Sequence, residues 1–170
     1  MTSQQLDRQD LDKQNAMPRI DFAFGASDRL RTACQVARKQ YQAGQRLVVY
    51  CTDASRLAAF DRLLWALDDI SFVPHVLATD ALASVTPVLL TAADPARAAE
   101  VAGTDGTPPW LLNLDDGCPP GYDGYARVLE IVSQDGDDRQ AARNRWREYL
   151  AAGHEPHSHA IGGGQRSQEG

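Results

Sequence analysis

The chain has 170 residues, of which 43% are hydrophobic and 24% charged, and its formal net charge is -6. This composition is typical of one globular domain, and the negative charge argues against a protein whose whole surface coats nucleic acid or an anionic membrane. No apolar run approaches the roughly 20 residues of a membrane span. The N-terminal segment also lacks the apolar stretch of a secretory signal, so we expect a cytoplasmic protein.

Both ends of the chain are polar. Residues 1–18 are rich in Gln and Asp, and residues 154–170 contain the run Gly162-Gly163-Gly164. Segments of this composition bury too little apolar surface to offset the entropy lost on folding. Both ends are therefore predicted to be disordered, and the ordered domain is predicted to span residues 19–153.

The first half of this domain alternates strand and helix. Residues 20–24 alternate in polarity as a strand does, and Ser27 is a plausible N-cap for the helix that follows. Residues 47–51 form a continuous apolar run, which is typical of a strand buried on both faces. Asp53 is the predicted N-cap of a second helix over residues 54–67. Strand, helix and strand of these lengths predict a right-handed parallel unit.

The second half continues the alternation. A loop rich in Pro and Gly is predicted over 115–124, and the last helix is predicted to begin at Asp135 or Asp137 and to end near Ala152. Apolar runs predict three more strands, over residues 87–91, 110–114 and 128–132. A short helix is predicted over residues 95–101, after the first of these strands. The predicted fold is α/β, a single mostly parallel sheet of about five strands with helices on both faces, Rossmann-like in topology but without a nucleotide motif.

Large apolar side chains gather at the end of the second helix and just after it. At about 100° per residue, Trp65 lies well off the core stripe of its helix. Pro74 pushes Val73 into extended backbone, so the apolar groups, Phe72 included, lie on the helix end and on the rigid segment after it. This is the composition of a protein-interface anchor, although burial in the core is the alternative for both aromatics. We interpret His75, which has no base or nucleophile beside it, as a structural or interfacial residue.

The last helix carries a cationic stripe. Arg139, Arg143 and Arg147 are spaced i, i+4, i+8 and lie beside Trp146. Guanidinium groups next to an aromatic surface suit an acidic peptide that contains an aromatic residue, or a terminal carboxylate. A solvated helix face is the alternative interpretation of the same stripe.

Motifs for catalysis and cofactor binding are missing. The first strand–helix turn has one glycine and fits neither the dinucleotide nor the nucleoside triphosphate pattern, and Gly-x-Ser-x-Gly is also absent. We expect no cofactor and no metal. The three cysteines, Cys34, Cys51 and Cys118, are interpreted as small buried hydrophobes. Three histidines, His154, His157 and His159, are interpreted as residues of a solvated tail.

Two segments together resemble one known family. Leu64-Trp65-Ala66 followed by Ser71–His75, and later Ala142–Tyr149, resemble the chi subunit of bacterial DNA polymerase III. The similarity covers about residues 19–153 and is most specific at 44–75 and 139–149.

The resemblance implies a non-catalytic accessory protein of the clamp loader. It implies pairing with the psi subunit, binding of the acidic C-terminal tail of single-stranded DNA-binding protein (SSB), and binding of an iron–sulfur repair helicase in competition with psi. The positions that match the tail site are Val132, Arg139, Arg143, Trp146 and Arg147. The aromatic residues Trp65 and Phe72 match the psi and helicase surface, and Val73 and Pro74 are assigned to it with them.

A small α/β nucleotide-binding domain or enzyme is the alternative function, because a phosphate can still bind at a helix N-terminus. Direct binding of single-stranded DNA is disfavoured by the acidic chain and by the lack of a run of aromatics that could stack on bases.

Overall fold

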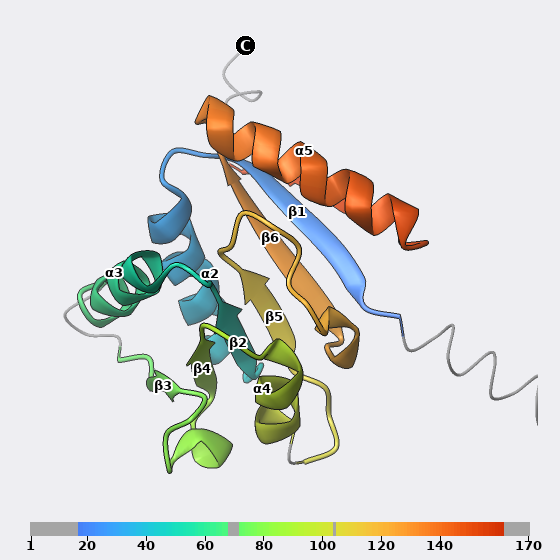
Figure 1. Cartoon of the computed structure of the whole chain (residues 1–170). Coiled ribbons are helices and arrows are strands. Elements are labelled where there is room, and N and C mark those ends of the chain that lie inside the picture. The colour runs from blue at the N-terminus through green and yellow to red at the C-terminus, as the bar shows by residue number, and fades with distance from the viewer. Residues whose placement is uncertain (1–16, 68–71, 104, 162–170) are drawn as a thin grey trace, which may run out of the picture.

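One parallel sheet organises the described chain (Figure 1), with the strand order β3-β4-β2-β5-β6-β1-β7. The computed structural model describes residues 17–67, 72–103 and 105–161. Every strand pairing in this part of the chain is parallel. The strands are β1 (Arg19–Ala26), β2 (Leu47–Tyr50), β3 (His75–Leu77), β4 (Val88–Thr91), β5 (Trp110–Asn113), β6 (Arg127–Ser133) and β7 (His157–Ala160).

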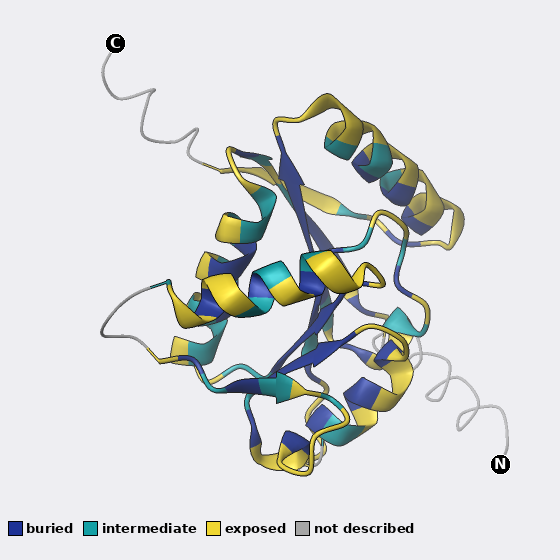
Figure 2. Cartoon of the chain, turned by 60° about the vertical axis from the view of Figure 1, so that its left-hand side comes forward, coloured by how far each residue is buried: buried dark blue, intermediate teal, exposed yellow. Residues whose placement is uncertain are grey.

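Helices cover the sheet in two layers. On one face α2 (Arg29–Gln42) and α3 (Ala54–Trp65) pack against the strands through Cys34, Phe60 and Leu64. On the other face α4 (Pro95–Ala102) and α5 (Gly136–Ala151) do the same. The central strands are therefore buried from both sides (Figure 2), which explains their continuous apolar sequences. The α/β class is confirmed.

The sheet has seven strands in the described residues, so the prediction of about five strands was too low. The two strands that were not predicted are β3 and β7. Strand β3 follows Pro74 directly and is only three residues long. Strand β7 is polar and exposed along its whole length, and main-chain pairing joins it to β1. Neither strand has the apolar pattern that marks a buried strand, so the sequence did not reveal them.

The ordered chain also continues past the predicted boundary at residue 153. Residues 154–161 were assigned to a disordered tail, which is wrong for this segment because it contains β7. His154 is buried, and its Nε2 lies 2.9 Å from the hydroxyl of Tyr122, so it is not a solvated residue. The remaining terminal residues, 1–16 and 162–170, lie outside the described residues.

Aspartates begin the helices. Asp53 and Asp135 cap α3 and α5 as predicted, each accepting hydrogen bonds from two backbone N–H groups. For α2 the predicted cap was wrong by one residue: Asp28, not Ser27, accepts from the backbone N–H of Arg31. Asp94 caps α4. Two single-turn 3-10 helices, η1 (Ala83–Val85) and η2 (Tyr122–Gly124), complete the described secondary structure.

A buried polar network fixes α5 to the sheet. The Arg145 side chain is 1% exposed and its Nε donates to Glu130 Oε2 at 3.0 Å, while Glu130 in β6 is fully buried. Tyr149 Oη donates to the same carboxylate oxygen at 3.0 Å, and Asn113 Nδ2 donates to it at 3.1 Å. Because three donors from two elements converge on one carboxylate, the rotation of α5 about its axis is set.

No helix in the described residues is both long enough and apolar enough to cross a membrane.

Candidate functional site

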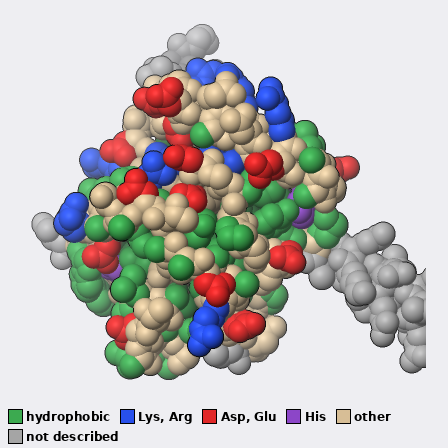
Figure 3. All heavy atoms as spheres, viewed as in Figure 1, with side chains coloured by type: hydrophobic (Ala, Val, Ile, Leu, Met, Phe, Trp, Pro, Cys, Tyr) green, Lys and Arg blue, Asp and Glu red, His purple; other side chains and the backbone are tan. Residues whose placement is uncertain are grey.

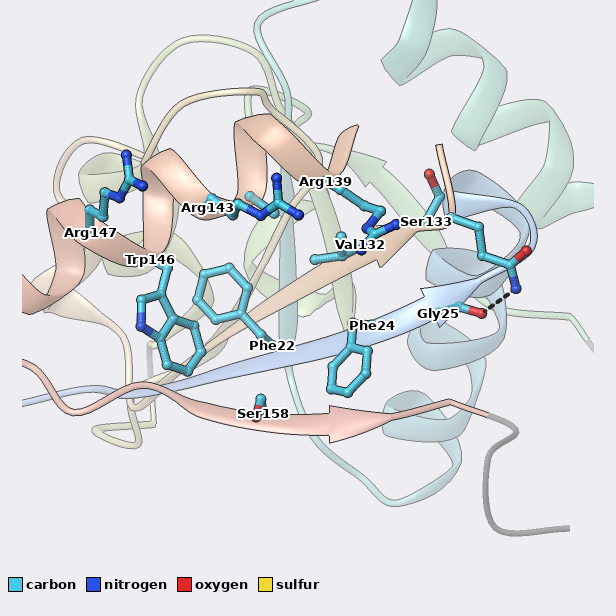
Figure 4. Close-up of a pocket in the computed structure, with 12 residues that line it drawn as sticks. Phe22, Phe24, Gly25, Val132, Ser133, Arg139, Arg143, Trp146, Arg147 and Ser158 are labelled. Atoms are coloured by element: carbon cyan, nitrogen blue, oxygen red, sulfur yellow. Dashed lines mark hydrogen bonds between the residues drawn. The ribbon is translucent and has the colours of Figure 1, made fainter. Parts of the chain in front are cut away.

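The residues predicted to bind an acidic peptide line one groove, of about 470 Å³, between α5 and the outer strands of the sheet. Figure 4 shows the rings of Phe22, Phe24 and Trp146 in the space between α5 and β7. The groove is lined by all five predicted tail-site residues and by others from β1, α5 and β7, among them Phe22, Phe24, Gly25, Ala142 and Ser158.

The apolar floor is built from adjacent strands and the helix above them. Phe22 of β1 contacts Trp146 of α5, with ring centroids 5.0 Å apart at an angle of 57°. Val132 in β6 is buried, so it supplies floor surface to the groove rather than an exposed side chain. Strand β7 closes the outer side, where Ser158 pairs in register with Phe22.

The cationic rim comes from α5 alone. Arg139, Arg143 and Arg147 are all exposed, and Figure 4 shows their side chains following one another along the helix. Arg143 Nη1 donates to Gln140 Oε1 at 3.3 Å. No carboxylate of the described residues lies within ion-pair distance of these three guanidinium groups. Their charge is therefore available to an anion from outside the chain.

The residues predicted from the sequence include the three arginines of the rim and part of the floor. They do not include Phe22, Phe24 or any residue of β7. Phe22 and Phe24 are two residues apart on β1, so they share one face of the sheet. Their alternation was visible in the sequence. Their neighbours were not, because the pairing of β1 with β6 joins residues about a hundred positions apart.

A second exposed surface lies on the other side of the molecule. Trp65 at the end of α3 is 53% exposed and Phe72 is 58% exposed, although each is large and apolar. Their ring centroids are 5.0 Å apart at an angle of 40°. We call these two residues the aromatic pair. Large apolar side chains exposed side by side are typical of protein contact sites.

The two residues after Phe72 differ in what they can offer to a partner. Pro74 is half-buried beside the aromatic pair. Val73 is 3% exposed and belongs to the core under α2 and α3, so its predicted role in direct partner contact is wrong. In extended backbone successive side chains point to opposite sides, so exposing Phe72 turns Val73 inward.

The groove and the aromatic pair lie at opposite edges of the sheet. The groove is built on β6, β1 and β7, whereas Phe72 leads into β3 at the other edge (Figure 1). In the space-filling view, cationic side chains are visible along α5 at the top, and apolar ones cover much of the rest of this face, the α3 and β3 side included (Figure 3). The two surfaces therefore differ in both place and chemistry.

The remaining reactive groups are held in inert surroundings. All three cysteines are free, and Cys34 and Cys51 are buried as predicted. Burial raises the pKa of the Cys34 thiol to about 12, and burial next to Glu148 raises that of Cys118 to about 12. These thiols stay protonated and are poor nucleophiles. The described residues contain no group of three or more side chains suited to hold a metal ion.

Comparison with known proteins gives one consistent result. Residues 17–157 match the family model described as DNA polymerase III chi subunit, HolC. The DNA polymerase III subunit chi of Pseudomonas aeruginosa is 29% identical over 149 residues, which cover 85% of this chain and 98% of that protein. The protein of the same name from Escherichia coli is 27% identical over 120 residues, covering 71% of this chain and 77% of the relative.

Proposed function

Because this chain belongs to the DNA polymerase III chi subunit family, and is by that membership an accessory subunit in DNA replication, we propose that it works as an adaptor. One partner is the acidic C-terminal tail of SSB, which binds in the groove under α5. The other is the psi subunit of the clamp loader, which binds the aromatic pair. In this proposal the chain has no catalytic activity of its own.

One observation carries the tail site: three exposed guanidinium groups, none of which has an ion pair among the described residues, stand above an apolar floor in a single groove. An extended acidic peptide can place carboxylates against Arg139 and Arg143 while an aromatic side chain lies on Phe22 and Trp146. Charge-assisted bonds from Arg to carboxylate are about twice as strong as neutral ones. The net charge of -6 on the whole chain does not oppose this, because exposed charges beyond about 10 Å are largely screened.

The aromatic pair supports the second partner. Trp and other large apolar residues dominate the energetics of protein interfaces, and here two of them are exposed in contact with each other. In the proposal, psi covers this pair, and an iron–sulfur repair helicase competes for the same surface. The two docking sites are then occupied together, since they lie at opposite edges of the sheet.

The alternative function, nucleotide binding, is less well supported by the helix ends. A phosphate at a helix N-terminus needs the free N–H groups of the first turn. All four α-helices of the described chain begin with an aspartate whose carboxylate already accepts from those groups. A phosphate there would displace, or be repelled by, that carboxylate.

The tail site is tested by calorimetry with a synthetic acidic peptide that ends in an aromatic residue. Arg143→Ala is expected to weaken binding roughly 10- to 100-fold, because a charge-assisted hydrogen bond is lost. Arg97→Ala is the matched control, since Arg97 is an exposed arginine on α4, outside the groove.

A complementary variant separates the two sites. Phe72→Ala should bind the peptide as the wild type does but lose psi in a pull-down, whereas Arg143→Ala should do the reverse. Unchanged peptide affinity in Arg143→Ala would refute the tail site, and unchanged capture of psi by Phe72→Ala would refute the role of the aromatic pair.

A further inference from the structure

His75 is enclosed under the aromatic pair by two hydrogen-bond acceptors. Its Nδ1 lies 2.7 Å from the carbonyl oxygen of Val73, and its Nε2 lies 2.8 Å from Oδ1 of Asp61 in α3. The His75 side chain is 1% exposed, whereas the Asp61 side chain is 43% exposed. The ring is therefore cut off from solvent, and both of its nitrogens point at oxygens.

These contacts decide the protonation of the ring. A neutral imidazole has one N–H donor and one acceptor, while the protonated ring has two donors. A backbone carbonyl and a carboxylate can only accept. Both hydrogen bonds are made together only when both nitrogens carry a proton, and the ring then has a positive charge that Asp61 balances.

The same ring packs against the aromatic pair. The centroids of His75 and Trp65 are 4.8 Å apart at an angle of 51°, and Trp65 in turn contacts Phe72. A cation at this distance from an indole is attracted by the electrons of the ring. The segment that holds Phe72 and Val73 is also bonded to α3 through His75, since one ring nitrogen meets Val73 and the other meets Asp61.

Resting on the proposed docking function, we infer that His75 is a positioning residue whose positive charge, paired with Asp61, holds Trp65 and Phe72 in the arrangement that psi binds. The ring thus joins the end of α3 to the segment before β3. This assigns a role to Asp61 and His75, which themselves need not touch the partner.

The number of protons on the ring decides how many of these contacts it can make. The groups that face the ring are Asp61 and Trp65 from α3, the Val73 carbonyl from its own segment, and the apolar Val88 paired with it from β4. A ring that carries a single proton makes only one of the two hydrogen bonds and places no charge under Trp65.

Asp61→Asn tests the pairing directly. An amide can rotate to donate its N–H to a neutral Nε2, so this variant keeps a hydrogen bond without requiring the charge. We expect Asp61→Asn to bind psi roughly five- to tenfold more weakly than the wild type, because a charge-assisted hydrogen bond is replaced by a neutral one. Nitrogen chemical shifts of the His75 ring in the full wild-type chain should report two N–H groups.

Other measurements keep this test separate from the proposed function. Trp65→Ala should abolish psi binding, and if it does not, the docking role fails whatever the state of His75. If Trp65→Ala does abolish binding, a His75 ring with a single N–H proton in the wild type, or equal affinity of wild type and Asp61→Asn for psi, would overturn the positioning role. Binding of the acidic peptide in the groove should be the same in wild type and Asp61→Asn.

Discussion

Removing the cation of the buried pair that fixes α5 should strongly destabilise the domain. Arg145→Met replaces the guanidinium with an apolar side chain and leaves the carboxylate of Glu130 in the core without its ion-pair partner, with only the charge of Arg29 still acting on it. Such a change typically costs about 3–5 kcal/mol. Here Tyr149 and Asn113 still donate to the carboxylate, and the variant also removes a buried Nη2 that has no partner, so we expect about 3 kcal/mol. For a domain of this size that lowers Tm by roughly 6–12 °C.

The pH dependence of this deficit follows from Glu130. Burial raises the pKa of its carboxyl group, and Arg145 opposes that effect, so removal of Arg145 raises the pKa further. A group with a raised pKa in the folded state contributes stability below its unfolded pKa and loses it as the pH rises through the folded pKa. The Arg145→Met deficit should therefore be small in acid and grow towards neutral pH.

Urea unfolding followed by circular dichroism, at several pH values, measures both effects. The double variant Glu130→Gln/Arg145→Met should recover most of the loss, because the remaining amide can accept from Tyr149 without a buried charge. A deficit below about 1 kcal/mol at neutral pH, or a double variant no more stable than the single one, would refute the reasoning that the pair is held by charge.

Two further predictions concern the sheet and one tight turn. Burial opposes ionisation of Asp21, but hydrogen bonds from Arg127, His159 and Arg19 outweigh burial and lower the pKa of this carboxyl group. The stability that Asp21 contributes is therefore present above its pKa in the unfolded chain and is lost as the pH falls through its pKa in the folded chain. Asp21→Asn should then cost roughly 2 kcal/mol near neutral pH and flatten the acid side of the stability profile in urea unfolding. Gly121 has a φ of 68°, and a Cβ added there would lie 2.9 Å from the Cβ of Ala96, so Gly121→Ala should lower stability by about 1–3 kcal/mol. The neighbouring control Gly124→Ala, whose Cβ would meet its nearest atom at 3.6 Å, should cost under about 1 kcal/mol, and equal melting temperatures for the two variants would contradict the steric account.

For α5, the sequence predicted which arginines lie together on the exposed side of the helix, but it did not predict that Arg145 is buried. The spacing of Arg139, Arg143 and Arg147 placed them in one stripe, and the groove confirms that they lie together. Arg145 falls among the buried residues of the helix, with Ala142 and Tyr149, so its charge is enclosed. A charged residue in an apolar strand, as Glu130 is, was the available signal that a cation would be needed inside.

Non-local pairing limited what the sequence could say about the groove. Val132 and α5 are close in the chain, so their contact was within reach of pattern reasoning. Phe24 joins them because β1 pairs with β6, and Ser158 because β7 pairs with β1. Strand β7 has no apolar residue pattern, and its backbone hydrogen bonds to a particular neighbour cannot be inferred from side-chain periodicity.

The segment around Pro74 was predicted correctly in backbone and wrongly in one side chain. Its extended form followed from proline, and Phe72 is exposed. The same extended form requires that Val73 face the other way, so its burial was implied by the very argument that assigned it to the interface. The same applies to His75, two positions after Val73, which also points inward.

The position of the two surfaces bears on how an adaptor can work. Each surface is fixed to the sheet by contacts of its own: α5 by the buried pair of Glu130 and Arg145, and the aromatic pair, in the role we infer, by His75 and Asp61. The strands between them are packed on both faces, and such cores resist gradual deformation. Substitutions at sites this far apart, without shared partners, should have additive effects on binding free energy. The proposed adaptor therefore joins its partners by holding both at once, with little influence of one on the affinity of the other.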